Sequence, residues 1–136
     1  MSSFVTHLES AIDGTHLPAD RVQTLHKDRP LWVRYDLAAV ADAMSKDVVA
    51  SRENSMWRYR ELLPVKDTRN IITLGEGMTP LLHLKRLGRE IGVENLYLKD
   101  EGIIPTGTFK ARGAAVGVSR ARELGVDVLA MPTNGN

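Results

Sequence analysis

The sequence contains no cysteine. Without a thiol the chain cannot form disulfides, thiolate zinc sites or a cysteine nucleophile. It also lacks an apolar run long enough to span a bilayer, and its first residues lack the charged start and apolar core of a signal peptide. We therefore expect a cytoplasmic protein with no membrane partner.

The chain carries almost no net charge, since 18 Lys and Arg residues oppose 17 Asp and Glu residues and leave a net charge of +1. Proteins that bind nucleic acid usually present a basic field, so we expect no nucleic-acid partner. The 136 residues are 43% hydrophobic and 26% charged. That composition is typical of a soluble protein, and the length suffices for one domain with a core.

Residues 1–35 are polar and punctuated by glycine and proline, which predicts a loop-rich N-terminal arm with one short strand at 31–35. The arm contains three histidines, His7, His16 and His26. Their spacings of nine and ten residues match no compact ligand pattern. We therefore predict solvated histidines and no metal site.

The rest of the chain alternates between helical and strand patterns. Residues 36–74 form a predicted helical connecting segment, with Asp36 as an N-cap. From residue 75 onwards a dense turn signal precedes a helix to about residue 91, a strand at 96–99, a helix from about 109 to 124 and an apolar strand at 126–131. Strand, helix and strand in this order predict an α/β fold with a parallel βαβ unit.

Lys110 lies on the first turn of the second of these helices. Exposed N–H groups make a helix N-terminus partly positive, so the ammonium form is disfavoured and the lysine pKa is expected to fall. A neutral amine is the form that attacks an aldehyde. A solvated surface lysine is the ordinary alternative, but the loop before Lys110 and the loop at 132–136 should meet at the ligand-binding edge of the sheet.

Four segments in order resemble consecutive motifs of the threonine synthase family, pyridoxal-phosphate enzymes of fold type II. They are Gly75-Glu-Gly-Met-Thr-Pro-Leu81, Leu98-Lys-Asp-Glu101, Pro105-Thr-Gly-Thr-Phe-Lys-Ala-Arg-Gly113 and Thr133-Asn-Gly-Asn136. The resemblance implies that residues 75–136 are the first part of a pyridoxal-phosphate catalytic domain.

The resemblance also implies roles for single residues. Lys110 would hold the cofactor aldehyde and move protons, Phe109 would pack beside the cofactor, and Asn136 would bond its phenolic 3′ oxygen. Three further residues would lie near the ring and the carboxylate of an amino-acid substrate: Thr133, Asn134 and Gly135.

Many members of the family begin with a cysteine-bearing zinc ribbon. Residues 9–14 occupy the place of its first ligand pair here, so the resemblance implies that residues 1–35 are a degenerate ribbon without metal. The family's glycine-rich phosphate loop lies further along the chain. We therefore expect an N-terminal portion of a longer homo-oligomeric enzyme, inactive as this fragment.

The reaction implied by the resemblance is the conversion of O-phosphohomoserine and water to threonine and phosphate. Ala111 and Ile104 depart from the threonine synthase pattern, where aspartate and asparagine are usual. A serine/threonine dehydratase or another β-replacing enzyme is therefore the alternative. A non-catalytic α/β binding module is an alternative of another class, although the retained Lys110 argues against it.

Overall fold

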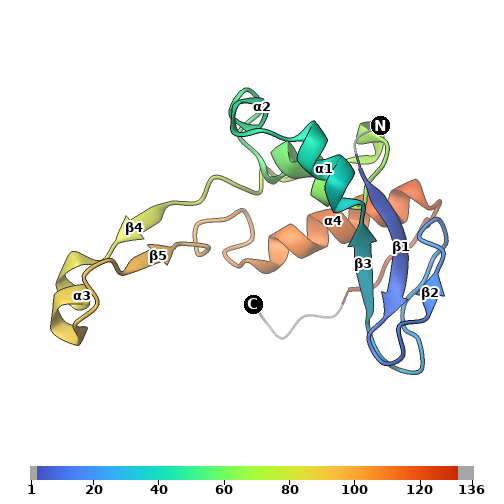
Figure 1. Cartoon of the computed structure of the whole chain (residues 1–136), viewed down its shortest axis with the longest axis horizontal. Helices are drawn as coiled ribbons and strands as arrows, with labels where there is room; N and C mark the ends of the chain where they lie inside the picture. The colour runs from blue at the N-terminus through green and yellow to red at the C-terminus, as the bar shows by residue number, and fades with distance from the viewer. Residues whose placement is uncertain (1–2, 132–136) are drawn as a thin grey trace.

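Two small antiparallel sheets lie at opposite ends of the molecule, and the longest helix, α4, lies between them (Figure 1). The computed structural model describes residues 3–131. In chain order the elements are β1 (Val5–Ser10), β2 (His16–Leu17), β3 (Leu31–Tyr35), α1 (Leu37–Ala43), α2 (Lys46–Ala50), the 3₁₀ helices η1 (Met56–Leu62) and η2 (Thr68–Asn70), β4 (Leu81–His83), α3 (Lys85–Ile91), β5 (Tyr97–Lys99) and α4 (Lys110–Glu123).

The N-terminal segment is more regular than the sequence predicted. Its strands form a sheet in the order β2-β1-β3, with antiparallel neighbours. The predicted strand at 31–35 is confirmed as β3. β1 was not predicted because its sequence is polar. It is held by pairing with β3, a strand that is distant in the sequence, and by an ion pair in which the Arg34 guanidinium donates to the two carboxylate oxygens of Glu9, at 2.7 and 2.8 Å.

An ion pair joins two turns of this N-terminal unit, which has no cysteine that could bind a metal ion. Asp13 follows β1 and accepts a hydrogen bond from Lys27 Nζ at 2.8 Å. The Nε2 atom of His26 lies 3.6 Å from the same carboxylate. Lys27 and further donors hold the pKa of Asp13 well below its usual range.

The helices begin where local side chains satisfy their free N–H groups. Asp36 accepts from the Ala39 amide at 3.0 Å, which confirms the predicted N-cap. The helical pattern breaks at Met44, and Ser45 caps α2 by accepting from the Val48 amide. The predicted helix at 109–124 is confirmed as α4.

The hydrophobic core lies between η1, the loop at 63–71 and α4. It consists of Met56, Trp57, Val65 and Ala115. Small side chains on α4 allow the loop to approach closely, and Ser119, which is fully buried, accepts from the Ile72 amide at 2.8 Å. At the end of the helix Glu123 accepts from the Asp67 amide at 2.6 Å. These contacts fix α4 against residues 65–72.

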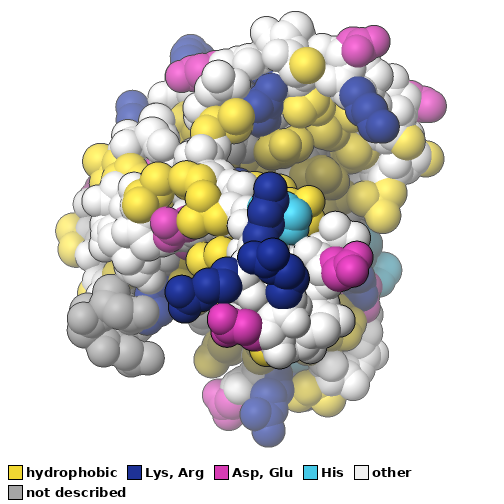
Figure 2. Space-filling model, turned by 90° about the vertical axis from the view of Figure 1, so that its left-hand side faces the viewer, with side chains coloured by type: hydrophobic (Ala, Val, Ile, Leu, Met, Phe, Trp, Pro, Cys, Tyr) yellow, Lys and Arg dark blue, Asp and Glu magenta, His cyan; other side chains and the backbone are white. Residues whose placement is uncertain are grey.

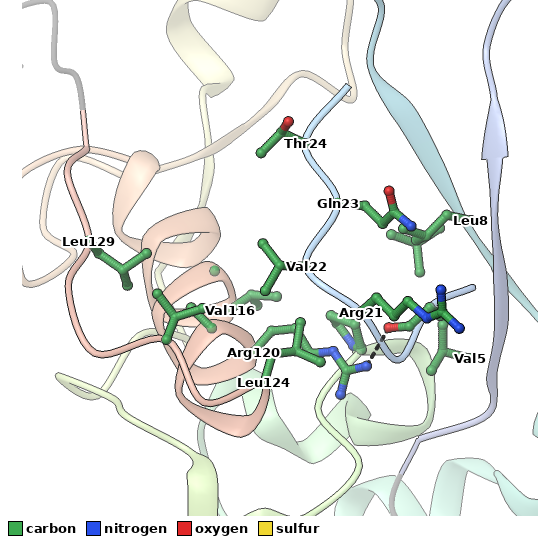
Figure 3. Close-up of a pocket in the computed structure, with 16 residues that line it drawn as sticks. Val5, Leu8, Arg21, Val22, Gln23, Thr24, Val116, Arg120, Leu124 and Leu129 are labelled. Carbon is green, nitrogen blue, oxygen red and sulfur yellow. Dashed lines mark hydrogen bonds between the residues drawn. The ribbon is translucent and has the colours of Figure 1, made fainter. Parts of the chain in front are cut away.

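An apolar groove of about 380 Å³ separates the N-terminal sheet from α4. Figure 3 shows Val5 and Leu8 on the side of the sheet and Val116 and Leu124 on the helix. Arg120 crosses the groove and donates to the carbonyl oxygen of Ala19 at 2.6 Å. The N-terminal sheet is therefore attached to the helix that carries Lys110.

At the opposite end, β4, α3 and β5 form a projecting arm (Figure 1). Figure 2 faces this end and shows hydrophobic side chains exposed beside Lys and Arg. The exposed apolar residues of the arm include Leu81, Leu82, Leu87, Ile91, Tyr97 and Leu98. Within the described residues, no helix combines the length and apolar character needed to cross a membrane.

The structure confirms a mixed α/β chain, but it does not confirm the parallel βαβ unit. β5 pairs antiparallel with β4, with Leu82 opposite Leu98. Residues 126–131 follow α4 as predicted, but they form no strand within the described part of the chain. A strand exists only where a neighbour supplies a hydrogen-bonded ladder, and no segment of residues 3–131 does so for 126–131.

Candidate active site

Lys110 is the first residue of α4, as the sequence predicted. Phe109 precedes it as the N-cap and supplies no side-chain hydrogen bond. The helix starts through backbone and hydroxyl contacts with Thr108, whose carbonyl oxygen accepts from the Ala111 amide at 3.1 Å. The side chain of Lys110 is half-buried, whereas Phe109 is 63% exposed. Lys110 thus lies at a helix N-terminus, directly after an exposed aromatic residue.

One polar network joins three of the four family-like motifs. Arg112, two residues after Lys110, donates to both carboxylate oxygens of Glu101 at 2.6 and 2.8 Å. Thr79 donates to Glu101 at 2.6 Å, and the Lys99 ammonium donates to the carbonyl oxygen of Thr79. We call these four residues the Arg112 network. They fix the first turn of α4 relative to the turn at 75–80 and the end of β5.

Within the Arg112 network, the pair of Arg112 and Glu101 is held in its charged state over the ordinary pH range. The guanidinium of Arg112 and, after it, the hydroxyl of Thr79 lower the pKa of Glu101 to about 2. The same contact raises the pKa of Arg112. A bidentate pair of this kind is rigid and directional. The pair of Arg112 and Glu101 therefore serves to position the start of α4, since neither partner changes its protonation state near neutral pH.

The turn before β4 depends on a close approach of two backbones. Gly77 has a φ of +139°, and a Cβ atom there would lie 2.7 Å from the Met56 nitrogen. The Met56 amide donates to the Glu76 carbonyl oxygen at 2.8 Å. The Glu76 side chain is 2% exposed and accepts from the Leu74 amide. Burial alone would raise the pKa of Glu76, but hydrogen bonds from Thr73 and backbone amides bring it below its ordinary value.

Two hollows flank the start of α4. A cavity of about 540 Å³ lies between η1 and the turn at 77–79, and its charged lining residues are Arg58, Lys99, Glu101 and Arg112. A groove of about 200 Å³ lies against the small side chains of the helix, with Thr73, Thr106, Ala111 and Ala114 in its wall. The charged residues of the first are mainly cationic, whereas the second is mainly apolar with Glu76 in its lining. Lys110 lines neither hollow.

The sequence-predicted residues Thr133, Asn134, Gly135 and Asn136 lie outside the described residues. The predicted meeting of their loop with Lys110 therefore stays a prediction, and so does the packing of Phe109 beside a cofactor. Thr79, Glu101 and Arg112 lie within three of the family-like motifs, but the sequence alone predicts no role for them. The sequence signal for this network is the presence of opposite charges, Glu101 and Arg112, in two different motifs. The spacing of the motifs does not show that these two residues form an ion pair.

Residues 72–136 match the family described as "Pyridoxal-phosphate dependent enzyme". This match covers the Arg112 network and Lys110 together. This segment of the chain is therefore similar to the pyridoxal-phosphate dependent enzymes. The predicted cofactor class is confirmed at this level, because the family is defined by pyridoxal phosphate.

Curated relatives of this pyridoxal-phosphate family segment extend the similarity into the N-terminal part. A threonine synthase of Methanocaldococcus jannaschii is 47% identical over 106 residues, which are 78% of this chain and 26% of that protein. A threonine synthase of Methanosarcina acetivorans is 41% identical over 132 residues, 96% of this chain and 32% of that protein. A third, of Halalkalibacterium halodurans, is 44% identical over 87 residues, 60% of this chain and 24% of that protein. The chain thus spans about a quarter to a third of the length of these relatives.

Proposed function

We propose that this chain is the N-terminal portion of a pyridoxal-phosphate dependent lyase of the threonine synthase type, which converts O-phosphohomoserine and water to threonine and phosphate. The observation that carries the proposal is Lys110, half-buried on the first turn of α4 and anchored through Arg112 and Glu101 inside the segment that matches the family. The similarity to threonine synthases over most of the chain supports this reaction above others of the family.

The residues of the site fit an aldehyde cofactor by their chemistry. Lys110 supplies the primary amine, and the groove against the following residues of α4, Ala111 and Ala114, offers a mainly apolar wall. When bound, pyridoxal phosphate supplies an electron sink for charge developing on the substrate. Lys110 Nζ would hold the cofactor and transfer protons, with Phe109 beside it.

The loop at 133–136 completes the proposed site. Asn136 would donate to the phenolic oxygen of the cofactor, and the backbone and side chains of Thr133, Asn134 and Gly135 would bind the substrate carboxylate. The same proposal includes a fold type II domain from residue 75, in which 126–131 become a parallel strand. It also includes a cytoplasmic homo-oligomer whose residues 1–35 keep a degenerate, cysteine-free ribbon and whose residues 36–74 connect the two parts.

The experiment compares two lysines at equivalent helix positions in the full-length protein. Lys85 begins α3 as Lys110 begins α4, and neither helix has a side-chain N-cap. Phosphate release from O-phosphohomoserine should fall by about 10³-fold or more in Lys110→Ala, because a covalent catalytic group is lost. It should remain within twofold of the wild type in Lys85→Ala. Equal rates in the two variants would refute the assignment of Lys110.

The competing reactions are separated by their products. Ammonia release from threonine without phosphate release from O-phosphohomoserine would replace the proposed reaction by that of a dehydratase. A colourless full-length protein that takes up no pyridoxal phosphate would exclude both enzymatic reactions and favour the non-catalytic binding module. Residues 1–136 alone are expected to bind the cofactor weakly and to release no measurable phosphate.

A further inference from the structure

The hairpin formed by β1 and β2 brings together two histidines and a glutamate that are separated in the sequence. His7 and Glu9 are two residues apart on β1, so their side chains share one face of the strand. His16 lies directly opposite Glu9 on β2. The rings of His7 and His16 have centroids 3.9 Å apart. One donor atom from each of the three residues lies within 4.8 Å of the others.

Hydrogen bonds determine which nitrogen of His7 is available. The Thr6 hydroxyl donates its proton to the carbonyl oxygen of Arg34 at 3.1 Å. It can therefore only accept from His7 Nδ1, which lies 2.9 Å away. In the neutral ring the Nε2 atom then carries the lone pair. Within the described residues this Nε2 atom is shielded from solvent and has no hydrogen-bond partner.

We propose that His7 Nε2, a ring nitrogen of His16 and the carboxylate of Glu9 bind a divalent transition-metal ion, with Zn²⁺ as the representative ion. Two imidazoles and one carboxylate form a frequent three-ligand set for zinc, with water in the fourth position. Thr6 supplies the outer hydrogen bond that ligating histidines commonly make through their second nitrogen. The site is independent of the proposed reaction at Lys110.

The geometry requires little movement to bind the ion. Ligand atoms about 2.0–2.1 Å from a tetrahedral zinc ion are roughly 3.3 Å apart. His7 Nε2 and Glu9 Oε2 are 3.9 Å apart. Both Glu9 oxygens accept from Arg34, but each carboxylate oxygen has a second lone pair. His16 is exposed, which leaves a path for entry.

The site also differs from the turns that carry Asp13 and His26. Those residues follow β1 and precede β3, whereas the three proposed ligands lie on the face of the hairpin. Leu8, between His7 and Glu9, lines the opposite side of β1 at the groove against α4 (Figure 3). The polar face is therefore separate from the contact with the rest of the molecule.

The test is calorimetric titration of Zn²⁺ into purified, tag-free protein. We expect one ion per chain, with affinity reduced by at least about tenfold in His16→Ala and in Glu9→Gln, since each removes a ligand. Thr6→Val should weaken binding by about 10–100-fold through the outer hydrogen bond. His83→Ala, which removes an exposed histidine on β4, should leave the affinity unchanged.

His16 is the decisive position because its exposed side chain can be removed without opening the core. Far-ultraviolet circular dichroism of each variant establishes that the hairpin is still folded. An absence of Zn²⁺ binding by the wild type would overturn the proposal. Binding that His16→Ala leaves unchanged would do the same.

Discussion

Replacement of Gly77 by alanine tests the close approach that forms the turn before β4. The new Cβ atom would lie 2.7 Å from the Met56 nitrogen and 2.9 Å from the Ser55 carbonyl carbon. Both are backbone atoms, so no side-chain rotation relieves the contact. The φ of +139° adds backbone strain for a residue with a Cβ atom. Overpacking costs about 1–3 kcal/mol and the strain about 1–2 kcal/mol, so we expect a loss of about 2–5 kcal/mol.

Two glycines provide matched controls for this prediction. Gly75 has a φ of +90° with no atom within 4 Å of a built Cβ, so Gly75→Ala measures strain without a clash. Gly113 lies within α4, also without a neighbour, so Gly113→Ala should stabilise the protein by about 0.5–1 kcal/mol. The free energy of unfolding is measured by urea titration with the fluorescence of Trp57, which is buried beside Met56. A loss of stability in Gly77→Ala no larger than that in Gly75→Ala would refute the prediction.

Three further predictions concern polar groups that hold the fold. Ser119→Ala should cost about 1–3 kcal/mol of unfolding free energy in urea titrations, because it leaves the Ile72 amide without its acceptor; an unchanged midpoint would contradict this. Arg52→Ala should cost about 3–5 kcal/mol because it removes both hydrogen bonds to the buried Glu61 carboxylate and leaves it the 3.8 Å contact with Arg60. Combining Arg52→Met with Glu61→Leu should recover most of that loss in thermal denaturation. The folded-state pKa of Glu101 is about 2 against an ordinary 4.5, so its contribution to stability is complete above about pH 4.5 and is lost as the pH falls towards 2. Glu101→Gln should remove this part of the pH dependence, and parallel curves for the two proteins would refute it.

The helices could be predicted from the sequence because their signals are local. Asp36 is followed by apolar residues at helical spacing, and it does cap α1. Gly92 directly follows α3 and Gly125 follows the C-cap residue of α4, and both have positive φ values as helix-ending glycines often do. Lys110 was placed correctly on the first turn for the same reason.

The strands of the N-terminal sheet could not be predicted, because they depend on partners distant in the chain. β1 is a polar segment whose ladder with β3 is stabilised by the pair of Glu9 and Arg34, 25 residues apart. The same non-locality concealed the Arg112 network and the cluster of His7 and His16. Conversely, residues 126–131 are apolar enough for a strand but have no ladder partner within residues 3–131.

The central claim is that Lys110 is the residue that carries the cofactor. The most direct measurement is borohydride reduction of the full-length protein with pyridoxal phosphate, followed by peptide mapping by mass spectrometry. We predict a stable pyridoxyl adduct on the peptide that contains Lys110, and none on the peptide that contains Lys85. A modification of both lysines to the same extent, or of neither, would contradict the claim.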